Sequence, residues 1–158
     1  MTDSVLNEKI QFTKSGLAEI KAELEELKGA KLTAAIERVA RARDFGDLSE
    51  NAEYHAAKEE LSFIEGRIEE LEGIVARAEV VGSKNKKGTI DIGCKVTVTL
   101  GGKEHTYEIV GEWEADPLKK KISHTSPLGQ ALVGKKMGEN VVFTAPAGKV
   151  IYKIKKIH

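Results

Sequence analysis

Two apolar stripes of helical period flank residues 44–54 of the chain. The stripe after this segment repeats at spacings of three and four over three heptads, which is typical of a coiled-coil helix. The stripe before it has the same spacings but slips by one residue near Gly29. Their members are Leu17, Ile20, Leu24, Leu27, Leu32, Ala35, Val39 and Ala42, and then Tyr54, Ala57, Leu61, Ile64, Ile68, Leu71, Val75 and Ala78. The pattern predicts two long helices, the first beginning after an N-cap at Thr13.

The two stripes fit an antiparallel hairpin, because facing residues then have position numbers with a constant sum. Before the slip, pairs such as Leu24 with Leu71 sum to 95, and beyond it pairs such as Val39 with Ala57 sum to 96. Two pairs of opposite charge agree with this register, namely Lys28 with Glu65 and Lys21 with Glu72. The chain therefore folds back near residue 48, with residues 44–54 at the tip of the hairpin.

The predicted tip is rich in carboxylates, since Asp44, Asp47, Glu50 and Glu53 lie within ten residues. Asp47 and Glu50 have the spacing of a helix capping box, and Gly46 suits the end of the preceding helix. A cap needs only one or two carboxylates, so a chemical role for these acids stays open. The basic residues beside the tip, Arg41, Arg43 and Lys58, fit either solvated helix faces or phosphate contacts.

Charge divides between the two halves of the chain. Residues 1–80 hold 11 Lys and Arg against 18 Asp and Glu, whereas residues 81–158 hold 14 Lys against 7 acids. Cys94 is the single cysteine, which excludes an internal disulfide framework. No stretch approaches the roughly 20 apolar residues that span a bilayer. We therefore expect a folded cytoplasmic protein with no membrane partner.

The second half has the pattern of a small β-sheet. Residues 81–93 are rich in Gly and Lys and predict a linker between a hairpin domain, 1–80, and a second domain, 94–158. Alternation and β-branched residues predict strands over 95–100, 106–110, 141–145 and 150–155. Gly101 and Gly102 predict a tight hairpin turn between the first two strands, and a short helix is predicted around 127–133, ended by Gly134. The fold class is therefore α+β, a helical hairpin followed by a small antiparallel sheet with one helix.

Two stretches carry a resemblance to a known family. Residues 46–59 read Gly-Asp-Leu-Ser-Glu-Asn-Ala-Glu-Tyr-His-Ala-Ala-Lys-Glu, and residues 126–135 read Ser-Pro-Leu-Gly-Gln-Ala-Leu-Val-Gly-Lys. Both resemble the bacterial transcript cleavage factors of the GreA type, and the likeness extends from Thr13 to about Ile157. It implies a coiled-coil hairpin that enters the secondary channel of RNA polymerase. It also implies an FKBP-like second domain that docks at the rim of the channel, with Ser126, Pro127 and Leu128 as contact residues.

The resemblance further implies roles for residues of the tip. Asp47 and Glu50 would hold a Mg²⁺ ion shared with the polymerase active site, and Arg43 and Lys58 would contact the nascent RNA 3′ end. Ser49 stands where related sequences often carry Lys, which weakens the basic patch. The implied function is to stimulate the polymerase's own Mg²⁺-dependent cleavage of backtracked RNA and so rescue arrested complexes.

Mg²⁺ is held poorly by two carboxylates alone, because it keeps its waters and relies on substrate phosphates for further ligands. The free chain is therefore expected to carry no cofactor and not to be an enzyme by itself. We also expect it to be a monomer.

Three alternatives remain. A related factor that inhibits the polymerase without cleavage would share the fold but have an altered tip. A prolyl isomerase would need an aromatic-lined pocket, for which the second half offers only Tyr107, Trp113, Phe143 and Tyr152. A coiled-coil adaptor would explain the heptads but not the acidic tip, and it would dimerise through the hairpin.

Overall fold

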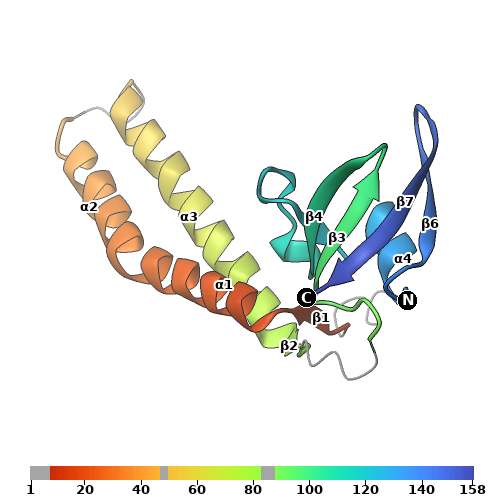
Figure 1. The fold of residues 1–158 in the computed structure, drawn as a ribbon. Coiled ribbons are helices and arrows are strands. Elements are labelled where there is room, and N and C mark those ends of the chain that lie inside the picture. The colour runs from red at the N-terminus through yellow and green to blue at the C-terminus, as the bar shows by residue number, and fades with distance from the viewer. Residues whose placement is uncertain (1–7, 47–49, 83–87) are drawn as a thin grey trace. The chain divides into compact units, whose positions relative to one another are not determined.

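The structure is a computed structural model that describes residues 8–46, 50–82 and 88–158. Residues 18–77 form one compact unit, and the described parts of residues 1–17 and 78–158 form a second. The fold class is α+β, with a helical hairpin in the first unit and a curled sheet in the second (Figure 1). The division that we predict at residue 80 differs from these units, because residues at both ends of the predicted hairpin domain pair within the second unit.

Four helical segments build the hairpin: α1 (Lys14–Glu26), the π-helical turn η2 (Leu27–Lys31), α2 (Leu32–Arg43) and the returning helix α3 (Ala52–Arg77). The first helix begins as predicted, since the Thr13 Oγ1 atom accepts a hydrogen bond from the Gly16 N–H at 3.1 Å. Both η2 and α2 pack against α3, which runs in the opposite direction (Figure 1). The tip lies between α2 and α3.

The π-helical turn explains the slip in the first apolar stripe. In this turn the Leu32 N–H donates to the Leu27 carbonyl five residues earlier, which adds one residue to the regular helical spacing. Leu27 and Leu32 are both stripe residues, five positions apart, so the extra residue keeps the stripe on one face. The extra residue is therefore confined to η2. It accounts for the predicted change in the sum of facing position numbers, from 95 before the turn to 96 beyond it.

Packing supports the predicted seam near the tip, where Val39, Ala42, Tyr54 and Ala57 form a buried cluster with Leu61 packed against it.

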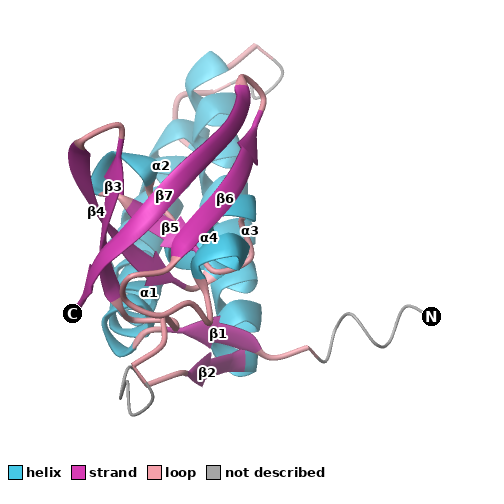
Figure 2. Cartoon of the chain, turned by 45° about the vertical axis from the view of Figure 1, so that its right-hand side comes forward, coloured by secondary structure: helices cyan, strands magenta, loops and turns pink. Residues whose placement is uncertain are grey.

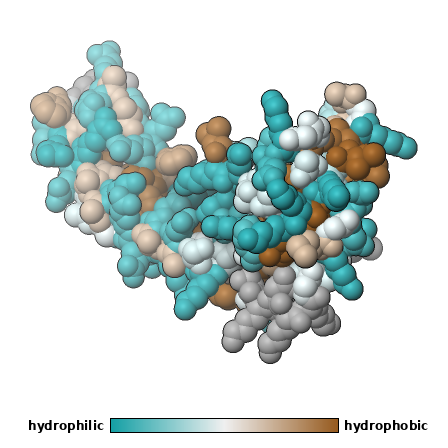
Figure 3. Space-filling model, viewed as in Figure 1, coloured by the Kyte–Doolittle hydropathy of each residue, from teal (hydrophilic) through white to brown (hydrophobic). Residues whose placement is uncertain are grey.

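The two predicted ion pairs between the arms are wrong, because Lys28 and Glu72, one residue from each predicted pair, pair with each other. Among the described residues, the ion pairs between the two arms are Lys28 with Glu72, Arg67 with Glu23, and Arg38 with Glu53 and Glu60. Long side chains thus reach about one turn farther than the register alone suggests. The outer surface of the hairpin is mostly hydrophilic in the view of Figure 3.

Deleting Gly29 should leave the hairpin folded, because removal of one residue from η2 converts the π-helical turn into regular α-helix and keeps the seam in phase. We expect the free energy of unfolding to stay within about 1 kcal/mol of wild type, since an exposed helical Gly is itself unfavourable.

The matched control is deletion of Gly66, an exposed glycine within the regular helix α3. That deletion rotates Leu71 and Ile74 off the buried face and should cost at least about 2 kcal/mol. Urea unfolding of both variants checks the assignment, and equal losses would show that η2 does not absorb the extra residue.

The sheet has five strands in the order β5-β4-β3-β7-β6, and Figure 2 shows β4, β3, β7 and β6 across its width. They are β3 (Lys95–Leu100), β4 (Lys103–Val110), β5 (Lys121–Ser123), β6 (Asn140–Ala145) and β7 (Gly148–Ile157). The four predicted strands pair antiparallel, and the predicted turn at Gly101 and Gly102 has positive φ at both residues. The expectation of a purely antiparallel sheet is wrong, because β5 pairs parallel with β4. Three residues were too short a run to show as a strand in the sequence.

One face of the sheet is covered by α4 (Pro127–Leu132), which contacts β5 and β6. The core beneath it consists of Ile90, Ile92, Cys94, Val96, Val98, Ile109, Leu132, Val141, Tyr152 and Ile154. Ile90 and Ile92 lie inside the predicted linker 81–93, and the Gly134 N–H donates to the Ile90 carbonyl at 2.8 Å. The described end of that segment is therefore part of the second domain, while residues 83–87 lie outside the described residues.

The sequence analysis missed two short strands, β1 (Ile10–Phe12) and β2 (Ala78–Val80), which pair in parallel. Strand β1 also contacts the 3-10 turn η3 (Glu112–Glu114), which belongs to the same unit as the sheet. Phe12 is fully buried there. A second 3-10 turn, η4 (Pro117–Lys119), precedes β5. Within the described part of the chain, no helix combines the length and the apolar character needed to cross a bilayer.

Candidate functional site at the hairpin tip

The tip begins where α2 ends at Arg43. The backbone continues in a turn, in which the Asp44 N–H donates to the Arg41 carbonyl at 3.2 Å and the Phe45 N–H donates to the Ala42 carbonyl at 3.3 Å. Gly46 has φ of 111°, a conformation that favours glycine and ends the helix as predicted. Asp47 and Ser49 lie outside the described residues.

Asn51 closes the tip from the other side, and this role was missed by the sequence analysis. Its Oδ1 atom accepts from the Tyr54 N–H at 3.1 Å, so Asn51 is the N-cap of α3. Its Nδ2 atom donates to the Ala42 carbonyl at 2.6 Å, which ties the start of α3 to the end of α2. The available signal was an N-cap residue type directly before the second apolar stripe begins at Tyr54.

The capping-box interpretation of Glu50 is therefore wrong. Helix α3 begins at Ala52, so Glu50 precedes the cap and does not occupy the third helical position. The side chain is exposed, and no hydrogen bond or ion pair joins it to another described residue. Glu50 thus offers a carboxylate at the tip that no other described residue engages.

Glu53, by contrast, is part of the structure of the hairpin. Arg38 of α2 donates to its carboxylate at 2.8 Å and also to Glu60. The hydrogen bond from Arg38, followed by its charge, lowers the pKa of Glu53. The same two glutamates raise the pKa of Arg38. Of the four carboxylates in residues 44–54, Glu53 is therefore engaged in holding the two arms together.

The structure brings together two of the three basic residues beside the tip, the two for which the resemblance implies RNA contact. The Arg43 Cζ atom lies 5.8 Å, and the Lys58 Nζ atom 5.4 Å, from the centroid of the Tyr54 ring. Tyr54 itself is 8% exposed and belongs to the buried cluster beneath the tip. Cations at these distances are attracted to the face of an aromatic ring. The Tyr54 ring thus places one cation from α2 and one from α3 on the same part of the tip.

The described residues contain no group of three or more His, Cys, Asp or Glu side chains placed to hold a metal ion. Carboxylate oxygens are nevertheless the ligands that Mg²⁺ prefers, and Glu50 is free of any structural partner among the described residues. Among the described residues the tip therefore offers one carboxylate of the kind that Mg²⁺ takes as a ligand, and an ion there would need its other ligands from elsewhere.

The predicted docking residues lie at the start of α4. The Ser126 Oγ atom accepts from the Gly129 N–H at 3.1 Å and donates to the Ser123 carbonyl at 2.7 Å. Pro127 is exposed at the first helical position, and Leu128 packs against the core. A Cβ atom on Gly129 would lie 2.0 Å from the Ser123 carbonyl oxygen. The hydrogen bonds of Ser126 and the small size of Gly129 therefore fix the corner formed by Ser126, Pro127 and Leu128, and Pro127 is the exposed residue of the three.

The aromatic residues weighed for a prolyl isomerase serve the fold of the second unit. Tyr152 is buried in the core, and Tyr107 and Phe143 pack against it. Burial raises the pKa of Tyr107. Trp113 belongs to η3. Since three of these four rings are used by the core, they favour a structural role over a binding pocket.

Comparison with known proteins decides the family. Residues 10–80 match the family model described as "Transcription elongation factor, N-terminal", and residues 85–158 match "Transcription elongation factor, GreA/GreB, C-term". The chain belongs to the GreA/GreB family of transcription elongation factors. The two GreA/GreB matches together cover both units of the structure.

Individual GreA/GreB relatives agree over nearly the whole chain. The chain is similar to transcription elongation factor GreA of Rhodospirillum rubrum, with 49% identity over 93% of this chain and 96% of the relative. GreA of a Bradyrhizobium species is also 49% identical, over 95% and 97%. Among solved structures, GreA factor homolog 1 of Thermus thermophilus is 29% identical over 96% of this chain and 99% of that chain, with a TM-score of 0.45.

Proposed function

We propose that this chain binds bacterial RNA polymerase, inserts the hairpin tip into the secondary channel and stimulates the polymerase's own cleavage of backtracked RNA. The observation that carries the proposal is that the tip holds both an exposed carboxylate, Glu50, with no partner among the described residues, and the Arg43 and Lys58 cations on the Tyr54 ring. A tip built only to join two helices needs neither feature, because Asn51 already caps and ties it. Membership of the transcription elongation factor family supports the same partner.

In this proposal the chain contributes ligands and charges and is not itself a nuclease. Asp47 and Glu50 would hold a Mg²⁺ ion together with groups of the polymerase and the RNA. When bound there, that ion supplies charge stabilisation for the oxygens of phosphoryl transfer. Arg43 and Lys58 bind phosphates of the displaced RNA 3′ end, which fixes the segment to be cleaved. The free chain then carries no cofactor and acts as a cytoplasmic monomer.

The proposal assigns docking to the second unit through the corner formed by Ser126, Pro127 and Leu128. Pro127 is the exposed member, while Ser126 holds the corner through two hydrogen bonds. Docking there would explain why the hairpin is joined to a folded sheet domain. In this arrangement the second unit provides the affinity for the polymerase, and the hairpin tip provides the groups that act in cleavage.

The decisive experiment adds the protein to a stalled, backtracked elongation complex and follows the labelled RNA. Shortened RNA that resumes elongation on addition of nucleotides supports the proposal. Slower elongation without shortened RNA would support the inhibitory alternative instead. If no bacterial polymerase yields shortened RNA, the proposed function is wrong.

Replacing Arg43 and Lys58 together by Gln should lower the stimulated cleavage rate at low salt by about five- to tenfold, because two phosphate contacts are lost. The loss should shrink as salt rises and screens the wild-type contacts. Cleavage rates at several salt concentrations measure both effects. The control is Arg41→Gln, which removes a nearby exposed charge. A loss that is the same at every salt concentration would indicate damage to the tip rather than lost phosphate contacts.

A further inference from the structure

Phe45 is a large apolar side chain that the fold leaves uncovered. It is the second residue after α2, and it is 79% exposed. Its backbone N–H donates to the Ala42 carbonyl, the same oxygen that accepts from the Asn51 side chain. The backbone of Phe45 is therefore fixed at the point where the two arms are tied, while its ring faces solvent.

The exposed ring adds nothing to the packing of the hairpin. The buried cluster near the tip ends at Ala42 and Tyr54 and does not include Phe45. A polar residue would serve the turn equally well, because the turn uses only the backbone of this position. The Phe45 ring is therefore free of a structural role among the described residues and available for a contact made in a complex.

The surroundings of Phe45 favour nucleic acid over protein as the contacting partner. Arg43 lies two residues before it, and Lys58 shares the Tyr54 ring with Arg43. The neighbouring residues Asp44 and Gly46 are exposed and offer no apolar surface to extend the ring into a protein interface. Exposed aromatic rings beside cations are typical of sites for single-stranded nucleic acid, where the ring stacks on a base and the cations bind phosphates.

We infer that Phe45 stacks on an unpaired base of the displaced RNA 3′ segment, next to the phosphates that Arg43 and Lys58 bind. The inference rests on the proposed function and adds a residue that recognises the base to residues that bind the backbone. Because every base has a π-face, stacking tolerates all sequences, but purines offer a larger surface. Phe45 therefore makes the cleavage rate depend on the identity of the displaced base.

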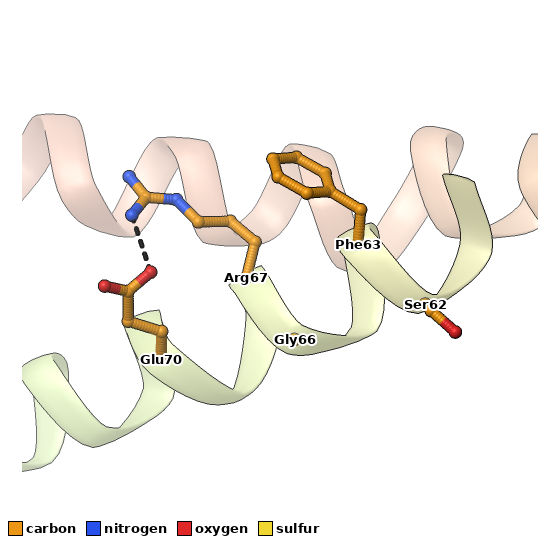
Figure 4. A pocket seen from close by; sticks show the side chains of 5 residues that line it. All are labelled: Ser62, Phe63, Gly66, Arg67 and Glu70. Atoms are coloured by element: carbon orange, nitrogen blue, oxygen red, sulfur yellow. Dashed lines mark hydrogen bonds and ion pairs between the residues drawn. The ribbon is translucent and has the colours of Figure 1, made fainter. Parts of the chain in front are cut away.

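The test compares Phe45→Leu, which keeps an apolar side chain without a π-face, with Phe45→Trp, which keeps the aromatic ring. Phe63→Leu is the matched control, since Phe63 is 75% exposed on the side of α3 next to Arg67 (Figure 4). At saturating factor, Phe45→Leu should lower the cleavage rate roughly tenfold, with a larger loss for a displaced purine than for a pyrimidine. Phe45→Trp and Phe63→Leu should cleave at rates close to wild type.

A second measurement reports stacking without relying on cleavage. A backtracked complex is prepared with 2-aminopurine at the RNA 3′ end, and its fluorescence is followed as factor is added in the absence of divalent metal. Wild type, Phe45→Trp and Phe63→Leu should quench this fluorescence, and Phe45→Leu should not. Retention on the complex in gel filtration verifies that each variant is bound.

The outcomes separate this inference from the proposed function. If wild type cleaves and Phe45→Leu cleaves and quenches equally well, the inference is wrong while the proposed function stands. If Phe45→Leu slows cleavage equally for all displaced bases and quenches like wild type, Phe45 contacts the polymerase and the inference is again wrong. If wild type yields no shortened RNA, the proposed function fails, and the fluorescence alone decides whether Phe45 stacks.

Discussion

Replacing Asp47 by Asn and Glu50 by Gln together is expected to lower the stimulated RNA cleavage rate by an order of magnitude or more. Each amide keeps the size of the side chain but loses the negative charge that Mg²⁺ prefers in a ligand. A tenfold loss corresponds to about 1.4 kcal/mol of transition-state stabilisation. The rate is measured in a backtracked complex at saturating factor and at two Mg²⁺ concentrations, and the higher concentration should restore part of the loss.

Stability should not change in the double amide variant, because Asn51 caps α3 and each amide keeps the size of the acid that it replaces. A matched control changes two exposed acids near the tip, Asp44→Asn with Glu59→Gln, and so removes the same charge. It should cleave at nearly the wild-type rate. Full activity in the Asp47 and Glu50 variant, with an unchanged melting temperature, would remove the metal assignment.

Replacing Glu114 by Ala is expected to lower the free energy of unfolding by about 3 to 5 kcal/mol. Its carboxylate accepts from the Thr13 N–H at 2.8 Å, from the Gly111 N–H at 3.0 Å and from the Thr13 hydroxyl. Thr13 and Gly111 are buried, so the substitution leaves donors without a partner, and each such group carries its own cost. For a chain of this size the melting temperature should fall by roughly 6 to 20 °C.

Glu112→Ala is the control for this prediction, because Glu112 lies in the same 3-10 turn but is exposed. It should change the unfolding free energy by less than about 0.5 kcal/mol. Calorimetry or urea unfolding measures both variants. Equal stability of the two would mean that the bonds from Glu114 to Thr13 contribute nothing to the fold.

The parts of the fold that depend on local periodicity could be predicted from the sequence. The apolar stripes located both arms of the hairpin, and the slip near Gly29 marked the π-helical turn, because an extra residue in a helix must appear as a phase change. The two adjacent glycines located the turn between β3 and β4. These features are set by residues within a few positions of one another.

The features that sequence reasoning missed depend on partners far along the chain. Strands β1 and β2 are three residues each and exist because they pair with one another and pack on η3. Strand β5 is defined by its parallel pairing with β4. At the tip, the capping-box spacing of Asp47 and Glu50 predicted the wrong N-cap. The hydrogen bond from Asn51 to the Ala42 carbonyl joins two helices, so the sequence pattern of α3 alone does not indicate it.

The bond between Thr13 and Glu114 also has a consequence for the order of events during synthesis. The two residues are 101 positions apart, and the hairpin arms lie between them. At about 5 to 20 residues per second, a ribosome needs roughly 5 to 20 s to add that length. The contacts of α2 with α3 can form before Glu114 is made, because α3 ends at Arg77 and the residues they join near the tip are close in sequence. The tip that carries the candidate site can therefore be assembled before Glu114 is available to bind Thr13.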